Sequence, residues 1–367
     1  MKDLEPYNPF IRGISPVGVA TAEWRDISRQ RQLPVEIYYP AGEQYRGRDL
    51  DPHSQDRWTA AGSMSGVGAT RSQAAVRDAD PAVGAYPLVL FAHGYSGDRR
   101  EFTGLCTHIA SHGYRVVSAD HIGSTFADID ARSDKSPRAS AEQQKRMAED
   151  RLGDVPFLIN SAERHFGDTF TTVGVTGASL GGWTSLMAPS TDARVRAIVP
   201  LCPGGVDGPL SAGATASLGD YLTLEWGSNV AMLTLVGDQD SWLPLYGQLR
   251  VFARCPAQTK HMVALRRADH QHFVDDMENC HGWYREFTLG LEATDKHSGT
   301  PWKAIAAMIR PWSELMPEAE ALAIICGLTT LHMDAHLKGT ADARVMAEDL
   351  GGQLRRRNLS AHVIALL

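Results

Sequence analysis

Positions 177–181 read GASLG, with Ser179 at the centre, and they follow directly on an apolar run at 172–176. A serine flanked by glycines between a strand and a helix is typical of a nucleophile elbow, a turn so tight that larger flanking side chains would collide with neighbouring backbone. A serine that only caps a helix gives a similar pattern. Taken with the residues described next, the pattern predicts that Ser179 is a nucleophile whose hydroxyl is presented to substrate.

A nucleophilic serine needs a base and an acid that orients the base. The apolar run 231–236 is followed by a turn that contains Asp238 and Asp240. We predict that Asp240 is the orienting acid. Asp238 is the alternative, and both aspartates are also ordinary turn formers.

The candidate bases follow the next apolar run, 261–265, which leads into His270 and His272. Imidazole has an ordinary pKa of about 6.5, so it can accept the serine proton and return it to a leaving group near neutral pH. We predict that His270 is the general base, with His272 as the alternative. The chain order is then nucleophile, acid, base.

Two backbone amides are candidates for binding the oxyanion that develops on the attacked carbonyl. Residues 93–97 read HGYSG after the apolar run 88–92, and this HGxxG pattern assigns one donor to the amide of Tyr95. Leu180 follows the nucleophile and begins a helix, so its amide is the second predicted donor. His93 is expected to hydrogen-bond beneath the loop.

The positions of several further side chains predict their roles. Tyr95, His121 and Trp242 are the predicted substrate contacts, with a structural role as the alternative for His121. Trp183 lies four residues after the serine and is predicted to be core. Arg151 and Asp154 have the spacing of an i,i+3 ion pair on a helix.

Strand-like and helix-like segments alternate, which predicts one α/β domain over 1–367 with a mainly parallel sheet flanked by helices. Reactive groups in such a sheet lie at the carboxyl ends of the strands. The predicted strands are Val35–Tyr39, Leu88–Ala92, Arg115–Ala119, Thr172–Thr176, Arg196–Val199, Ala231–Val236 and His261–Leu265. The predicted helices are Phe102–Ser111, Ala141–Ser161, Leu180–Ala188, Leu245–Ala253, Glu318–Leu337 and Thr340–Leu350.

Two segments interrupt this alternation. Residues 41–81 are rich in Gly, Ser, Asp and Arg, which predicts a long surface excursion. Residues 276–315 are rich in aromatic side chains, which predicts a helical lid or cap. Helices packed on the edge of the sheet are the alternative for the second segment.

Composition narrows the classes of partner and cofactor. The 367 residues carry a net charge of -7 without a dense Lys/Arg run, which disfavours nucleic acid or an anionic membrane as partner. No signal-peptide-like stretch begins the chain and no run of about 18 apolar residues occurs, so we expect a soluble, cytoplasmic protein. The five cysteines show no metal-ligand spacing and are predicted to be free, mostly buried thiols. The oligomeric state stays open.

With these residues in view, the chain resembles α/β-hydrolases of the group that includes platelet-activating-factor acetylhydrolases, dienelactone-hydrolase-like proteins and bacterial polyester-degrading esterases. Besides HGY at 93–95 and the elbow, the resemblance rests on LPVEIYYP at 33–40, ASHGYRVVSADH at 110–121 and HQHFVD at 270–275. It implies Ser179, Asp240 and His270 as the triad, and it implies hydrolysis of a carboxylic ester without a metal or organic cofactor. Dienelactone hydrolases have cysteine where this chain has Ser179, so their lactone substrate is not carried over.

The function expected from residues and resemblance together is cofactor-independent hydrolysis of a small carboxylic ester through an acyl-enzyme. An amide or thioester hydrolase with the same triad is one alternative, since leaving-group protonation and pocket shape decide between them. A non-catalytic ligand-binding relative is the other, because the fold does not dictate function.

Overall fold

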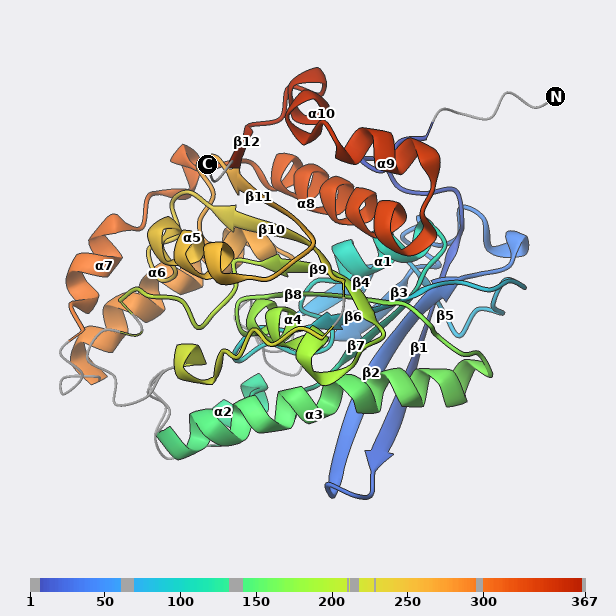
Figure 1. Ribbon diagram of the computed structural model, residues 1–367, viewed down its shortest axis with the longest axis horizontal. Helices are drawn as coiled ribbons and strands as arrows, with labels where there is room; N and C mark the ends of the chain where they lie inside the picture. The colour runs from blue at the N-terminus through green and yellow to red at the C-terminus, as the bar shows by residue number, and fades with distance from the viewer. Residues whose placement is uncertain are drawn as a thin grey trace.

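The apolar segments lie side by side in one sheet of ten strands among the described residues (Figure 1). This computed structural model describes residues 7–60, 69–131, 141–209, 211, 218–227, 229–294 and 300–364. The strand order is β12-β11-β10-β9-β8-β6-β7-β2-β1-β5. The strands are β1 (Val17–Asp26), β2 (Arg31–Pro40), β5 (Val76–Arg77), β6 (Leu88–Ala92), β7 (Arg115–Ala119), β8 (Val173–Ala178), β9 (Val195–Leu201), β10 (Ala231–Gly237), β11 (Thr259–Leu265) and β12 (Ala361–Ile364).

The centre of the sheet is parallel and its flanks are partly antiparallel. Strands β7, β6, β8, β9, β10 and β11 pair in parallel, whereas β2 pairs antiparallel with β7 and with β1, and β12 pairs antiparallel with β11. Every residue of β6, β8 and β10 is buried. Burial on both faces explains why these strands read as continuous apolar runs. All seven predicted strands are confirmed, as is the α/β class.

Helices cover both faces of the sheet (Figure 1). One core contains Leu105 and Ile109 of α1 with Ile324 of α8, and the opposite core contains Leu158 of α3 and Trp183 of α4. The predicted burial of Trp183 is therefore confirmed. The helices are α1 (Thr103–Ser111), α2 (Phe126–Asp130), α3 (Ala141–Phe166), α4 (Leu180–Thr191), α5 (Leu245–Arg254), α6 (Met277–Thr294), α7 (Trp302–Met308), α8 (Glu318–Met333), α9 (Ala341–Ala347) and α10 (Leu350–Arg356).

The excursion 41–81 carries more structure than its composition suggests. Its described part contains the antiparallel pair β3 (Asp56–Thr59) and β4 (Thr70–Gln73), and β5 joins the edge of the main sheet beside β1. Residues 61–68 lie outside the described residues. An ion pair of 2.7 Å between Arg71 and Asp276 ties this excursion to the start of α6.

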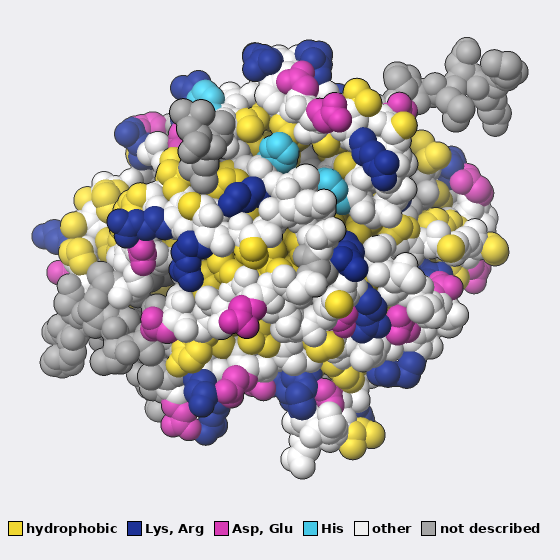
Figure 2. All heavy atoms as spheres, viewed as in Figure 1, with side chains coloured by type: hydrophobic (Ala, Val, Ile, Leu, Met, Phe, Trp, Pro, Cys, Tyr) yellow, Lys and Arg dark blue, Asp and Glu magenta, His cyan; other side chains and the backbone are white. Residues whose placement is uncertain are grey.

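The helices and the surface charges can be compared with the partners expected from the sequence. Among the described residues no helix combines the length and the apolar character that crossing a membrane requires. On the face drawn in Figure 2, Lys and Arg side chains are interspersed with Asp and Glu. The first six residues, on which the expectation about a signal peptide partly falls, lie outside the described residues.

Candidate active site

Ser179 lies at the junction of β8 and α4 with φ 55° and ψ -112°. This positive φ is unfavourable for a residue with a Cβ atom. A Cβ atom at Gly177 or at Gly181 would collide with the carbonyl oxygen of Ala92 on the neighbouring strand β6. The two glycines of the pentapeptide are therefore required by close packing, as the elbow predicts.

Hydrogen bonds hold the strained residue in place. The Ser179 N–H donates to Leu201 O (2.9 Å), and its carbonyl accepts from Gly204 N–H (2.8 Å) and Trp183 N–H (3.0 Å). The side chain is only partly buried and lines a cavity of about 190 Å³. The hydroxyl is thus fixed by its backbone and open to a ligand.

His270 lines the same cavity and is paired with Asp240. The Nδ1 atom of His270 lies 2.8 Å from Oδ2 of Asp240. The other carboxylate oxygen accepts the N–H groups of Trp242 (3.0 Å) and Leu243 (2.8 Å). Burial opposes the charged imidazolium, but the Asp240 carboxylate and, after it, the neighbouring Cys202 outweigh this effect and raise the pKa of His270 above its ordinary value. The pair can orient a base and stabilise its protonated form.

Asp238 and His272, the alternative acid and base, bind other groups. Asp238 accepts the N–H of Arg267 (2.7 Å), which fixes the turn after β11. His272 is fully buried, with Nδ1 at 2.8 Å from Asp269 Oδ1 and Nε2 at 3.1 Å from Met316 O. With both ring nitrogens occupied, His272 is a structural residue.

The loop 93–97 passes beside the serine, and Tyr95 lines the cavity. His93 is fully buried beneath it: Nε2 accepts the N–H of His121 (2.9 Å), so Nδ1 carries the proton and donates to Gly94 O (2.7 Å). This confirms its predicted supporting role. Leu180 begins α4, so its N–H has no partner inside the helix.

Two ionisable side chains hold this loop, the buried Arg151 and the partly exposed Glu101, and sequence reasoning gave neither of them this role. The Arg151 guanidinium donates to His93 O (2.8 Å), Gly94 O (3.3 Å) and Ser124 Oγ (2.9 Å). From the other side, Glu101 accepts the Gly94 N–H (2.7 Å). Burial lowers the pKa of Arg151 to about 9 and raises the pKa of Glu101 to about 8. We call Arg151 and Glu101 the loop clamp.

The predicted ion pair between Arg151 and Asp154 is therefore wrong. Asp154 instead binds Arg31 (3.0 Å), Arg29 (2.9 Å) and Nδ1 of His121 (2.9 Å). His121 is 2% exposed and is not among the described residues that line the cavity. The structure thus gives His121 its alternative, structural role rather than a substrate contact.

The walls of the cavity are largely apolar. Trp242 stacks on His270 at 6.2 Å between ring centroids, which places it at the predicted position. Trp283 and Phe287 of α6 stack on each other at 4.5 Å and also line the cavity. Part of the 276–315 segment therefore forms one wall of the cavity, and the lid or cap stays a prediction. Its residues 295–299 lie outside the described residues.

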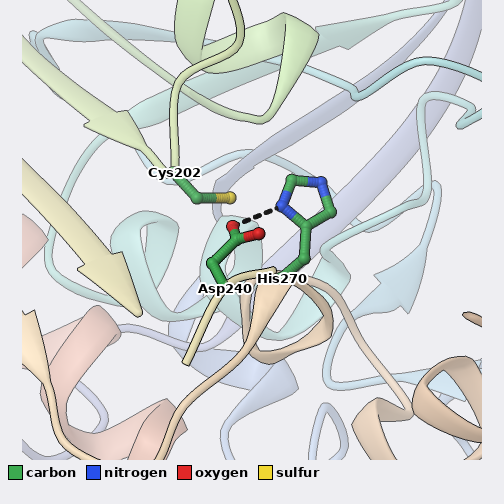
Figure 3. Close-up of side chains that lie close together, drawn as sticks. All are labelled: Cys202, Asp240 and His270. Atoms are coloured by element: carbon green, nitrogen blue, oxygen red, sulfur yellow. Dashed lines mark hydrogen bonds and ion pairs between the residues drawn. The ribbon is translucent and has the colours of Figure 1, made fainter. Parts of the chain in front are cut away.

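Cys202 is a further neighbour of the pair that the sequence did not single out. It follows β9, is 1% exposed and lines the cavity. Figure 3 shows its thiol converging with Asp240 on the Nδ1 edge of the His270 ring. Its position three residues after the predicted strand Arg196–Val199 was the one available signal.

Comparisons with known proteins agree with this architecture. Residues 30–151, about one third of the chain, match the family described as platelet-activating factor acetylhydrolase, isoform II. That segment holds the loop 93–97 and both residues of the loop clamp, and it ends before Ser179. No curated protein matches the chain.

Two solved structures are similar. A ferulic acid esterase from Streptomyces cinnamoneus has a TM-score of 0.57 at 21% identity, over 89% of this chain and 91% of its own. A protein assigned as a dienelactone hydrolase from Klebsiella pneumoniae has a TM-score of 0.44 at 14% identity, over 74% and 98%. The sheet described above and the likeness to the ferulic acid esterase give this chain the α/β-hydrolase fold, and over residues 30–151 it is similar to the platelet-activating factor acetylhydrolases.

Proposed function

We propose that this protein is a serine-dependent carboxylic ester hydrolase. One observation carries the proposal. The strained Ser179 and His270 line the same cavity, and Nδ1 of His270 lies 2.8 Å from Oδ2 of Asp240. The similarity of residues 30–151 to acetylhydrolases supports an ester as the substrate class.

The first half-reaction forms an acyl-enzyme. Nε2 of His270 accepts the Ser179 proton as Oγ bonds to the ester carbonyl carbon, while Asp240 holds the Nδ1 proton and stabilises the imidazolium. The amides of Tyr95 and Leu180 donate to the oxyanion. Collapse of the tetrahedral intermediate breaks the bond to the alkoxy oxygen, which leaves with the proton from His270.

The second half-reaction releases the acid. His270 takes a proton from a water molecule that attacks the acyl carbon, and it returns this proton to Ser179 Oγ as the acyl–oxygen bond breaks. Each step uses groups that line the cavity or are bonded to one that does.

The dimensions of the cavity suggest a small acyl group. An apolar cavity of roughly 150 Å³ can hold a benzene-sized ligand, and this one is about 190 Å³. We therefore expect short-chain or single-ring acyl groups to react faster than long chains. A series of p-nitrophenyl esters of increasing acyl length measures this.

The nucleophile is tested with a Ser179→Ala variant. We expect loss of p-nitrophenyl acetate hydrolysis and loss of covalent labelling by a fluorophosphonate, detected as the mass of the intact protein. Unchanged circular dichroism shows that the variant is folded. Labelling of wild type at another serine, or equal turnover by both proteins, would contradict the proposal. Absence of labelling in wild type would favour a non-catalytic binding protein.

The acid is tested with a matched pair of variants two residues apart. Asp240→Asn should lower kcat by about 10⁴-fold, because the amide cannot fix the reactive tautomer of His270. Asp238→Asn removes a carboxylate that contacts a backbone amide in a turn and should stay close to wild type. A reversed ranking of the two variants would reassign the acid. Matched ester, thioester and amide substrates then define the preferred leaving group.

A further inference from the structure

Three side chains with different donor atoms converge beside the catalytic base. One ligand atom from each of Cys202, Asp240 and His270 lies within 4.8 Å of the other two (Figure 3). Among the described residues, this is the only group of three or more His, Cys, Asp or Glu side chains found with such spacing. The site is empty.

The position of the thiol is fixed by the fold. Cys202 follows β9, which lies between β10 and β8, so it stands between the turn that carries Asp240 and the elbow that carries Ser179. Its N–H donates to Leu235 O at 2.7 Å and its φ is 35°. The backbone thus directs the thiol inward, and the cavity gives a small ion access to it.

The donor set suits a thiophilic divalent cation. Zinc binds thiolate, imidazole and carboxylate at about 2.0 to 2.3 Å, so tetrahedral geometry separates its ligand atoms by about 3.4 to 3.6 Å. The Nδ1 to Oδ2 distance is 2.8 Å, and all three atoms lie within 4.8 Å. Adjustments of about an ångström or less close the site, and a water in the cavity can be the fourth ligand. A thiolate and a carboxylate balance the charge of the ion.

We propose that Cys202, Asp240 and His270 form an inhibitory site for Zn²⁺ or Cd²⁺. The inhibitory part of this inference rests on the proposed hydrolase function. A cation that takes the Nδ1 lone pair displaces the hydrogen bond to Asp240, and the thiol releases its proton to solvent as sulfur binds. The proton of the neutral imidazole then resides on Nε2. That nitrogen becomes a donor and cannot accept the Ser179 proton, so a bound metal ion and catalysis exclude each other.

Inhibition is tested with ZnCl₂ and CdCl₂ on p-nitrophenyl acetate hydrolysis. Each rate is compared with that of the same protein without metal. We expect inhibition that EDTA reverses, and a half-inhibitory concentration that rises about tenfold or more in Cys202→Ala, since loss of even an outer-sphere partner weakens metal sites by about 10- to 100-fold. Cys280→Ser is the matched control, because Cys280 is buried and outside the group. Equal sensitivity of Cys202→Ala and wild type would overturn the proposal.

Binding is tested without any need for activity. The Ser179→Ala variant is titrated with CdCl₂, and the ultraviolet thiolate-to-cadmium absorption is followed. We expect one Cd²⁺ per chain, lost when Cys202→Ala is added. No such absorption overturns the site. Absorption without inhibition of wild type overturns the inhibitory role. If the cadmium absorption is seen but the wild-type protein hydrolyses no ester, the site stands and the proposed function is refuted instead.

Discussion

The backbone of Ser179 should make glycine more stabilising than alanine at this position. An L-residue held at φ 55° and ψ -112° carries strain of about 1 to 3 kcal/mol. Alanine keeps the Cβ atom and the strain, whereas glycine relieves it. Glycine loses about 0.5 to 1 kcal/mol more backbone entropy on folding. The Ser179→Gly variant should therefore be more stable than Ser179→Ala by about 0 to 2.5 kcal/mol.

The assay is equilibrium urea unfolding of the two variants, both of which lack the nucleophile. Ser185 supplies a matched pair on the same helix: it is buried, its hydroxyl donates to Gly181 O at 2.9 Å, and its φ is not positive. At this position the Ser185→Gly variant should be less stable than the Ser185→Ala variant by about 1 kcal/mol. The reasoning fails if position 179 shows the same sign as position 185.

Three further predictions concern the loop clamp and the cavity wall. Arg151→Met removes the guanidinium that donates to two loop carbonyls, so kcat should fall by about 10² to 10³, as for the loss of one oxyanion donor. Arg151→Lys should recover part of the lost activity. Steady-state kinetics, together with a measurement of stability, separates a loss of catalysis from unfolding. The pKa of Glu101 is raised by burial from 4.5 to about 8. Between pH 4.5 and about 8 the folded chain therefore binds a proton at Glu101 that the unfolded chain has lost. The free energy of unfolding should fall as pH rises through this interval, and it should fall less steeply in Glu101→Gln. Trp283→Ala removes an aromatic wall of the cavity and should shift the preferred acyl length upward in an ester series.

Local pattern was sufficient for strands that the sheet buries on both faces, but not for its edges. Strand β1 mixes small and charged residues, and its residues 20–25 alternate between partly exposed and exposed positions. Strand β12 has no fully buried residue. Both are strands because β2 and β11 offer unpaired edges to them, a tertiary cause that no short window of sequence contains.

The same limit applies to the site. Ser179, Asp240 and His270 could be predicted because each follows a strand, and strand ends of a parallel sheet share one edge. Cys202 also follows a strand, yet only the order β10-β9-β8 shows that it stands between Asp240 and Ser179. Strand order is set by packing, not by local sequence. Local sequence therefore predicts only a free, buried thiol at Cys202.

Arg151 illustrates how helix spacing misleads in a core. An i,i+3 pair contributes only about 0.2 to 0.5 kcal/mol on a helix. Asp154 has three cationic or imidazole partners from other elements, and the buried Arg151 donates to the carbonyls of His93 and Gly94. Tertiary partners of this kind outweigh a local pair.

The loop clamp and the elbow place unfavourable features on two sides of one cavity. Among the described residues no carboxylate lies within ion-pair distance of Arg151, although its side chain is buried, and burying a charge in this way costs free energy. Its bonds to His93 and Gly94, opposed by Glu101 on the Gly94 N–H, fix the peptide that precedes Tyr95. An oxyanion donor is effective when its direction is set before charge develops. Selection for activity would retain both the strained backbone of Ser179 and the buried charge of Arg151. Substitutions that stabilise the chain at these two positions should therefore also disable it.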